Sequence, residues 1–299
     1  GYVELCCSLR LIVEGQERRD PGHDRISLRG SESRLLVAVM LTEVTNPRQP
    51  ASAKSAEMLS PAFATDGPPA FELKFLISAE TAAAVEVWAE AHLSRDTHGD
   101  PELKGSYEIS TLYLDTPRFD VFHDAKELDG VKLRLRCYGN GSPVFLERKR
   151  RRADRVQKWR TPVESKDLRR LAQGSDTADW SGSGFQDEVE AREYRPVCLL
   201  TYLRAAFFHP SDVGHLRLTL DRAIRCAAAS DWSASVVPEA GACAISEDLV
   251  ICELKFREAM PQSFKQLIAE LGLTPGRFSK YRRACRALGL VSEREATDA

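Results

Sequence analysis

Residues 131–150, VKLRLRCYGNGSPVFLERKR, place more ordered charge in two short segments than solubility requires. In the first segment the residues alternate with a period of two, which is typical of a β-strand. One face of this predicted strand carries Lys132, Arg134, Arg136 and Tyr138, and the opposite face is apolar. The sequence therefore predicts a strand with a strongly basic face.

A dense group of turn residues, 139–143, separates this strand from a second β-rich segment that begins at Val144. The two segments are predicted to form a hairpin. On the second strand Phe145, Glu147 and Lys149 share a face, and residues two apart on a strand lie roughly 6.5 to 7 Å from each other. A carboxylate and an ammonium group are therefore expected to point the same way.

For a single hairpin of this kind, the commoner interpretation is an amphipathic element whose basic face lies in solvent. The rest of the chain favours another interpretation, because ordered charge recurs in strand-like segments along it. The spacing Glu-x-Lys occurs at Glu72–Lys74, Glu147–Lys149 and Glu253–Lys255, and further strand-like charge lies at Tyr202–Arg204 and Arg217–Asp221. Five such segments predict one shared polar interior, formed by a closed or nearly closed sheet.

Composition limits the classes of protein that fit. With 299 residues, 43% hydrophobic, the chain can bury one large core or two modest ones. The formal net charge of −2 does not favour a general nucleic-acid binder. The eight cysteines include no Cys-x-x-Cys spacing, which favours reduced, buried thiols in a cytosolic protein. The longest apolar run, 35–41, is far shorter than the ~20 residues that a membrane span needs.

The first part of the chain differs from the rest. Residues 1–68 are rich in Arg, Glu, Ser and Pro and show no sustained period, so we expect them to be disordered. The alternative is that this stretch includes an N-terminal extension foreign to the natural protein, which would then start at Met58. A single domain is predicted over 69–292, and a disordered tail over 293–299. Within the domain, strands are predicted over 71–77, 107–115, 131–138, 144–150, 155–162, 197–208, 215–224 and 248–256.

Helices are predicted between some of these strands and after the last of them. Their N-terminal signals are Ser78, Ser165, Pro261 and Ser279, and a further helix is expected between a surface loop over 175–188 and Arg195. Strands with inserted helices indicate the α+β class.

Taken together and in order, these motifs resemble the VTC domain, the polyphosphate polymerase domain of the vacuolar transporter chaperone family, within the triphosphate tunnel metalloenzyme superfamily. The resemblance covers roughly 71–290. It is carried by Glu72–Lys74, Thr111–Asp115, Arg134–Arg136, Glu147–Lys149, Tyr202–Arg204, Arg217–Asp221, Glu253–Lys255 and Ser279–Tyr281.

The resemblance implies an eight-stranded antiparallel β tunnel with flanking helices. It further implies a polyphosphate polymerase that transfers the γ-phosphate of ATP to a growing chain with Mn²⁺ or Mg²⁺. Carried over by position, the catalytic cations are Arg134, Arg136, Lys149, Arg204, Arg217 and Lys280. Lys74, Lys158, Lys255 and Tyr202 would bind substrate, and Glu253 would hold the metal.

Three departures bear on the subfamily. The CYTH branch of the superfamily opens with Glu-x-Glu-x-Lys, whereas this chain has Ala70-x-Glu72-x-Lys74, which argues against that branch. Neither a phosphate-sensing SPX domain nor a membrane segment is recognisable. These two departures argue against a protein that couples synthesis to transport by itself. We expect a cytoplasmic protein, with a separate membrane protein as the partner that could place it at the inner membrane.

Three classes of function remain open at this stage: a transferase that makes polyphosphate from ATP, a hydrolase of tripolyphosphate or nucleoside triphosphates, and a non-catalytic polyanion-binding module. Phosphoryl transfer depends largely on positioning and charge stabilisation, so no Ser/His/Asp or Cys/His arrangement is needed. Two cations 7 Å apart repel by roughly 2.4 kcal/mol at an effective dielectric constant of 20. A tunnel with this many cations is therefore expected to contain interleaved carboxylates and to bind an anion.

Overall fold

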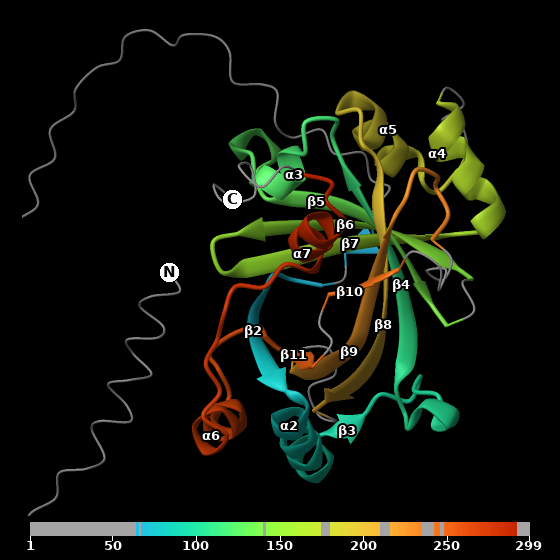
Figure 1. Ribbon diagram of the computed structural model, residues 1–299. Helices are drawn as coiled ribbons and strands as arrows, with labels where there is room; N and C mark the ends of the chain where they lie inside the picture. The colour runs from blue at the N-terminus through green and yellow to red at the C-terminus, as the bar shows by residue number, and fades with distance from the viewer. Residues whose placement is uncertain are drawn as a thin grey trace, which may run out of the picture. The chain divides into compact units, whose positions relative to one another are not determined.

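The computed structural model of the chain describes residues 64–65, 67–139, 142–174, 180–209, 216–234, 242–245 and 248–291. Eight strands of this part form a closed antiparallel barrel (Figure 1). They are β2 (Ala70–Ser78), β4 (Tyr107–Asp115), β5 (Val131–Tyr138), β6 (Val144–Arg152), β7 (Arg155–Val163), β8 (Arg195–Phe208), β9 (Arg217–Ala228) and β11 (Leu249–Phe256). The predicted α+β class with an eight-stranded tunnel is confirmed.

The strands follow the order β2-β7-β6-β5-β4-β8-β9-β11, and the pairing of β11 with β2 closes the ring. Three two-residue strands lie outside it: β1 (Ala64–Thr65) pairs with β7, β3 (Ser94–Arg95) with β8, and β10 (Cys243–Ala244) with β9. Apart from residues 64–65 and 67–68, the expectation for 1–68 falls outside the described residues, as does that for 293–299.

Cross-strand register determines which side chains share the interior. Arg134 on β5 lies directly opposite Glu147 on β6, and Glu253 on β11 lies directly opposite Lys74 on β2. Directly opposed residues of an antiparallel pair point to the same face, so the charged period-two residues of neighbouring strands turn inward together. The apolar residues between them point outward. Leu133, for example, is fully buried in the hydrophobic core.

Helices cover parts of the barrel. They are α2 (Ala79–His92), α3 (Asp120–His123), α4 (Arg169–Gln173), α5 (Ser183–Ala191), α6 (Gln262–Glu270) and α7 (Lys280–Ala287), with 3₁₀ turns at Pro101–Leu103, Lys126–Leu128 and Ser165–Leu168. Ser78 and Ser279 are N-caps, because their side chains accept the backbone N–H of Thr81 and Arg282 at 3.1 and 3.3 Å. None of the described helices is both long and apolar enough to cross a membrane.

Two local predictions were wrong. Ser165 is not a cap, because it is the first residue of a 3₁₀ turn and Glu164 occupies the cap position. Helix α5 begins at Ser183, inside the predicted 175–188 loop, because Phe185 and Val189 bury one face of that helix. The predicted free thiols are found at the six described cysteines, five of which are buried.

Candidate functional site

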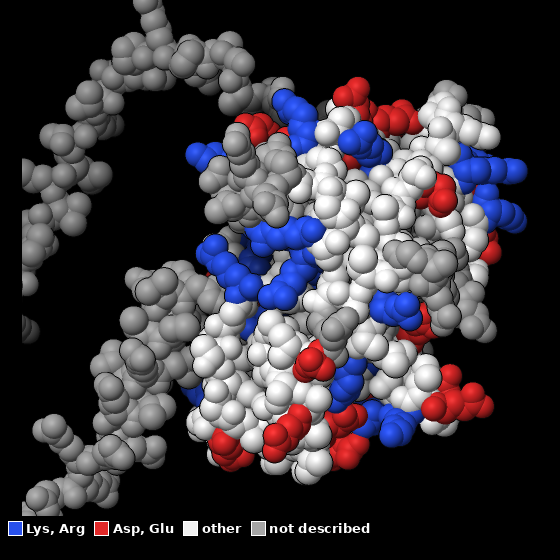
Figure 2. Space-filling model, viewed as in Figure 1, with Lys and Arg blue, Asp and Glu red and all other residues white. Residues whose placement is uncertain are grey.

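The barrel encloses a cavity of about 160 Å³ whose lining is dominated by cations. Figure 2 shows Lys and Arg side chains gathered around a hollow on one face. Seven of the lining cations are predicted site residues: Lys74, Arg134, Arg136, Lys149, Lys158, Arg204 and Lys280. The predicted residues Tyr202 and Glu253 line the same cavity. The fold therefore brings together side chains that lie up to 206 positions apart in the sequence.

Glu147 is buried at the centre of one group of cations. Its carboxylate lies 2.6 Å from the guanidinium of Arg134, 3.7 Å from that of Arg136 and 3.1 Å from that of Arg160. Burial alone would raise the pKa of Glu147, but these three arginines hold it well below its usual value. Glu147 is therefore ionised and fixes the arginines in place.

Glu72 is the centre of a second group, made of lysines. Its carboxylate lies 2.7 Å from Lys149, 3.3 Å from Lys158 and 3.4 Å from Lys74. Lys74 also lies 3.1 Å from Glu253. Burial would raise the pKa of Glu72, but the three lysines hold it well below its usual range. Burial and the neighbouring lysines also hold the pKa of Lys149 well below its usual value, although Glu72 opposes this.

Asp221 on β9 organises the third group. It accepts two hydrogen bonds from Arg204, at 2.6 and 2.7 Å, and one from Lys280 at 2.5 Å. Burial would raise the pKa of Asp221, but Arg204 and Lys280 hold it far below its usual value. The Lys280 ammonium also lies 4.8 Å from the centre of the Tyr202 ring. Tyr202 in turn accepts a hydrogen bond from Arg136 at 3.1 Å.

Positive charge exceeds negative charge in this part of the described chain. Nine cations line the cavity, and Arg160 is a tenth cation that contacts Glu147. These ten face four carboxylates: Glu72, Glu147, Asp221 and Glu253. Six positive charges are thus formally in excess in a site of low dielectric constant, where each unit charge about 4 Å away contributes about 4 kcal/mol at an effective dielectric constant of 20. An anion with several charges, bound among these cations, would relieve their repulsion.

Two predicted site residues do not line the cavity. Arg217 is 36% exposed and binds Asp96 at 3.3 Å and the Tyr107 hydroxyl at 2.8 Å. Lys255 lies directly opposite Arg217 in the register of β11 and β9. The reason is the position of these residues along their strands. Arg217 is the first residue of β9, four residues and about 13 Å from Asp221, so it lies at the end of the barrel and not beside the cavity, and Lys255 lies opposite it.

Sequence reasoning missed three charged residues of the site. Lys132 and Arg151 line the cavity, and Asp221 pairs with two of its cations. The signal for Lys132 was present, since it shares the period-two face of Arg134. Arg151 continues the inward alternation of Glu147 and Lys149, but the predicted strand ended at residue 150, two residues before the end of β6. Asp221 ends the motif Arg217–Asp221, but no role was predicted for it from the sequence.

Few carboxylates of the described cavity could hold a divalent metal. Among the described residues, no group of three or more His, Cys, Asp or Glu is arranged to hold a metal ion. Glu253 is the only carboxylate that lines the described cavity, and Glu72 lies close enough to raise its pKa. Burial raises the pKa of Glu253 further, but Lys74, Lys149 and Lys158 lower it to about 2. One or two ionised carboxylates suit Mg²⁺ or Mn²⁺ when phosphate oxygens and water complete the shell.

Comparison with solved structures finds similar chains at low sequence identity. A putative adenylate cyclase from Bacillus halodurans is 12% identical, with 72% of this chain and 96% of that chain covered and a TM-score of 0.46. One from Vibrio parahaemolyticus is 15% identical, with coverage of 71% and 97% and a TM-score of 0.39. A putative adenylyl cyclase from Hippeastrum, described as having a dominant triphosphatase activity, is 15% identical, with coverage of 73% and 96% and a TM-score of 0.43.

No curated protein matches the chain significantly. The comparison with family models is decisive, because the VTC domain model matches residues 70–289. The matched range begins with β2 and ends two residues after α7, so it contains all eight barrel strands and the cation-lined cavity. The resemblance seen in the motifs is thereby confirmed, and the chain belongs to the VTC domain family.

Proposed function

We propose that this protein is a polyphosphate polymerase that transfers the γ-phosphate of ATP to a polyphosphate chain bound inside the barrel. One observation carries the proposal: among the described residues, nine Lys and Arg side chains line a single cavity, and Glu253 is the one carboxylate that lines it. The formal net charge of the whole chain is only −2, so this concentration of positive charge is local.

A linear phosphate chain matches this cavity in charge. Such a chain carries about one negative charge per phosphate, and cations that arrive from several strands can neutralise it on all sides. Arginine guanidinium groups donate in a fixed fork that suits phosphate oxygens. Glu147 and the Tyr202 hydroxyl orient Arg134 and Arg136, so less side-chain entropy is lost when phosphate binds.

The proposed reaction needs no covalent enzyme intermediate. A terminal oxygen of the bound chain attacks the γ-phosphorus of ATP and forms a new P–O bond. The bond between the γ-phosphorus and the bridging oxygen breaks, and the electron pair leaves with ADP. Negative charge spreads over the oxygens of the transferred group, and fixed cations such as Arg136 and Lys280 would stabilise it.

A divalent ion fits the proposal through Glu253, with Glu72 as a neighbouring carboxylate. When bound, Mn²⁺ or Mg²⁺ would supply charge neutralisation at the phosphate oxygens. The residues of this chain would hold the substrate in line, and the enclosing barrel strands would restrict the entry of water. Exclusion of water matters because water and a chain end compete for the same phosphorus atom.

Product analysis tests the proposal. The protein is incubated with ATP and Mn²⁺, and the products are separated on a polyphosphate gel beside an assay for free phosphate. Long phosphate chains are expected. Free phosphate without chains would overturn the polymerase in favour of a hydrolase that uses the same cavity. The absence of both products would overturn it in favour of a non-catalytic polyanion-binding module.

A further inference from the structure

Two consecutive residues at the start of α7 both line the cavity but bind different carboxylates. Lys280 reaches the cavity, where its ammonium lies 2.5 Å from Asp221 and above the ring of Tyr202. Tyr281 is buried, and its hydroxyl donates a hydrogen bond of 2.5 Å to Asp115. Neighbouring residues on an α-helix are about 100° apart around the axis, so the placement of one determines that of the other. Lys280 is thus coupled to Asp115 through the backbone of α7.

Asp115 is a firmly held acceptor. It ends β4, is fully buried, and accepts the backbone N–H groups of Thr116, Val121 and Phe122 at 2.7, 2.8 and 3.0 Å. These bonds connect it to the first residues after β4 and to α3. With Tyr281 as a fourth donor, both carboxylate oxygens are fully used. Asp115 is therefore a rigid acceptor on the barrel, and its hydrogen bond with Tyr281 can fix the position of α7.

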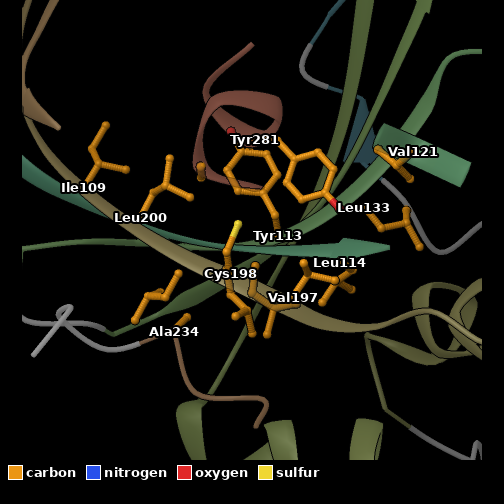
Figure 3. Packing of buried hydrophobic residues seen from close by; sticks show 14 of the residues in the cluster. Ile109, Tyr113, Leu114, Val121, Leu133, Val197, Cys198, Leu200, Ala234 and Tyr281 are labelled. Atoms are coloured by element: carbon orange, nitrogen blue, oxygen red, sulfur yellow. The ribbon is translucent and has the colours of Figure 1, made fainter. Parts of the chain in front are cut away.

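Ring packing supports the same arrangement. The rings of Tyr281 and Tyr113 are stacked, with centres 5.4 Å apart and planes at 25° (Figure 3). Arg134 points its guanidinium at the Tyr113 hydroxyl, at 3.5 Å. Contacts from Asp115, Tyr113 and Tyr281 thus run continuously from the core to two cavity cations, Arg134 and Lys280.

We propose that Asp115 and Tyr281 are positioning residues that hold α7 so that Lys280 enters the cavity at the place where phosphate binds. The ligand named here rests on the proposed function. Helix α7 has only eight residues, and the preceding segment, 271–279, contains no helix or strand. Helices this short are unstable on their own, so tertiary contacts must set its position. The motifs Thr111–Asp115 and Ser279–Tyr281 then act together to position Lys280.

The test removes a single oxygen atom. Tyr281→Phe keeps the stacked ring and deletes the hydrogen bond to Asp115. Substitution of Asp115 itself is avoided, because it would leave three buried N–H groups unpaired. Tyr194→Phe is the matched control: Tyr194 is also buried, and within the described chain its hydroxyl has no hydrogen-bond partner. Tripolyphosphate affinity is expected to fall roughly three- to tenfold in Tyr281→Phe and to stay unchanged in Tyr194→Phe.

A double-mutant cycle separates positioning from general destabilisation. In the background Lys280→Met, the further change Tyr281→Phe is expected to cost no additional tripolyphosphate affinity, because its effect acts through the missing ammonium. Equal losses in both backgrounds would overturn the proposal, as would an unchanged affinity in Tyr281→Phe alone.

Amide hydrogen exchange measured without ligand tests the positioning role of Tyr281 independently of the proposed function. Amide exchange in α7 is expected to rise in Tyr281→Phe and not in Tyr194→Phe. Unchanged protection of α7 would overturn the positioning role, whatever the ligand. If the unsubstituted protein failed to bind tripolyphosphate, the proposed ligand would be refuted, and exchange in α7 would decide the positioning role alone.

Discussion

Glu253 combines negative charge, burial and access to the cavity, so it tests whether a metal takes part. Glu253→Gln keeps the size of the side chain and removes the charge that would hold a divalent ion. Mn²⁺-dependent turnover is expected to fall by about a hundredfold or more, because a bound metal contributes several kcal/mol of charge stabilisation. Tripolyphosphate should still bind through the lysines and arginines, as measured by calorimetry.

Arg136→Ala is the matched comparison, because it removes a cation from the same cavity and should weaken both turnover and tripolyphosphate binding. The opposing interpretation is that Glu253 only neutralises Lys74, which lies 3.1 Å away. Near-normal Mn²⁺-dependent turnover in Glu253→Gln would support that interpretation and remove the metal role.

Lys149 is expected to make tripolyphosphate binding depend on pH. Burial and the nearby cations Lys74 and Lys158 hold its pKa well below the usual value, and a bound polyanion would raise it again. The complex then binds more protons than the free protein, so tripolyphosphate affinity should fall as the pH rises through the lowered pKa. Calorimetry at a series of pH values below the ordinary lysine pKa of about 10.4, in buffers of different ionisation enthalpy, should detect proton uptake on binding.

Lys149→Arg provides the control for this prediction, since arginine stays protonated throughout that range. Proton uptake should be reduced in this variant. The same uptake in both proteins would assign the titration to a group other than Lys149.

At the scale of single elements, the β5–β6 hairpin shows why the carboxylates are present. Glu147 on β6 holds two arginines of β5 and Arg160 of β7. Glu147→Gln should lower the free energy of unfolding by about 3–5 kcal/mol, because the arginines are left buried without their counter-charge. Urea denaturation measures this loss, and an excess of tripolyphosphate should reduce it by supplying the missing charge.

Glu270→Gln on α6 is the control for this change, because Glu270 is exposed and its loss should shift the free energy of unfolding by no more than about 0.5 kcal/mol. A loss in Glu147→Gln as small as in the control would contradict the structural role of Glu147.

The strands were the most predictable elements, since their inward and outward faces differ in sequence. The period-two face quoted for β5 is the face that meets Glu147 and the cavity. Helix boundaries were less predictable. Helix α5 begins in a stretch whose Gly and Ser residues suggested a loop, and its apolar face becomes visible only once it packs against the barrel. The intrinsic helix propensities of these residues do not predict that tertiary contact.

At the scale of the whole molecule, closure of the barrel decides which charged residues meet. The inward face of each strand could be predicted from its own sequence, but the end of the barrel could not, because it depends on the register between strands. Arg217 has the alternation expected of a cavity residue, yet it lies at the start of β9 beside Asp96. Asp115 and Tyr281 lie 166 positions apart, and no local pattern predicted their hydrogen bond.

The central claim is that the cavity inside the barrel binds a linear phosphate chain. Calorimetric titration with tripolyphosphate, beside sulfate at equal ionic strength, tests it most directly. The account predicts one saturable site that prefers tripolyphosphate, weakened about tenfold or more by Arg136→Ala and unchanged by Arg169→Ala, which removes an exposed arginine of α4. Equal binding of sulfate, or equal weakening by the two substitutions, would contradict it.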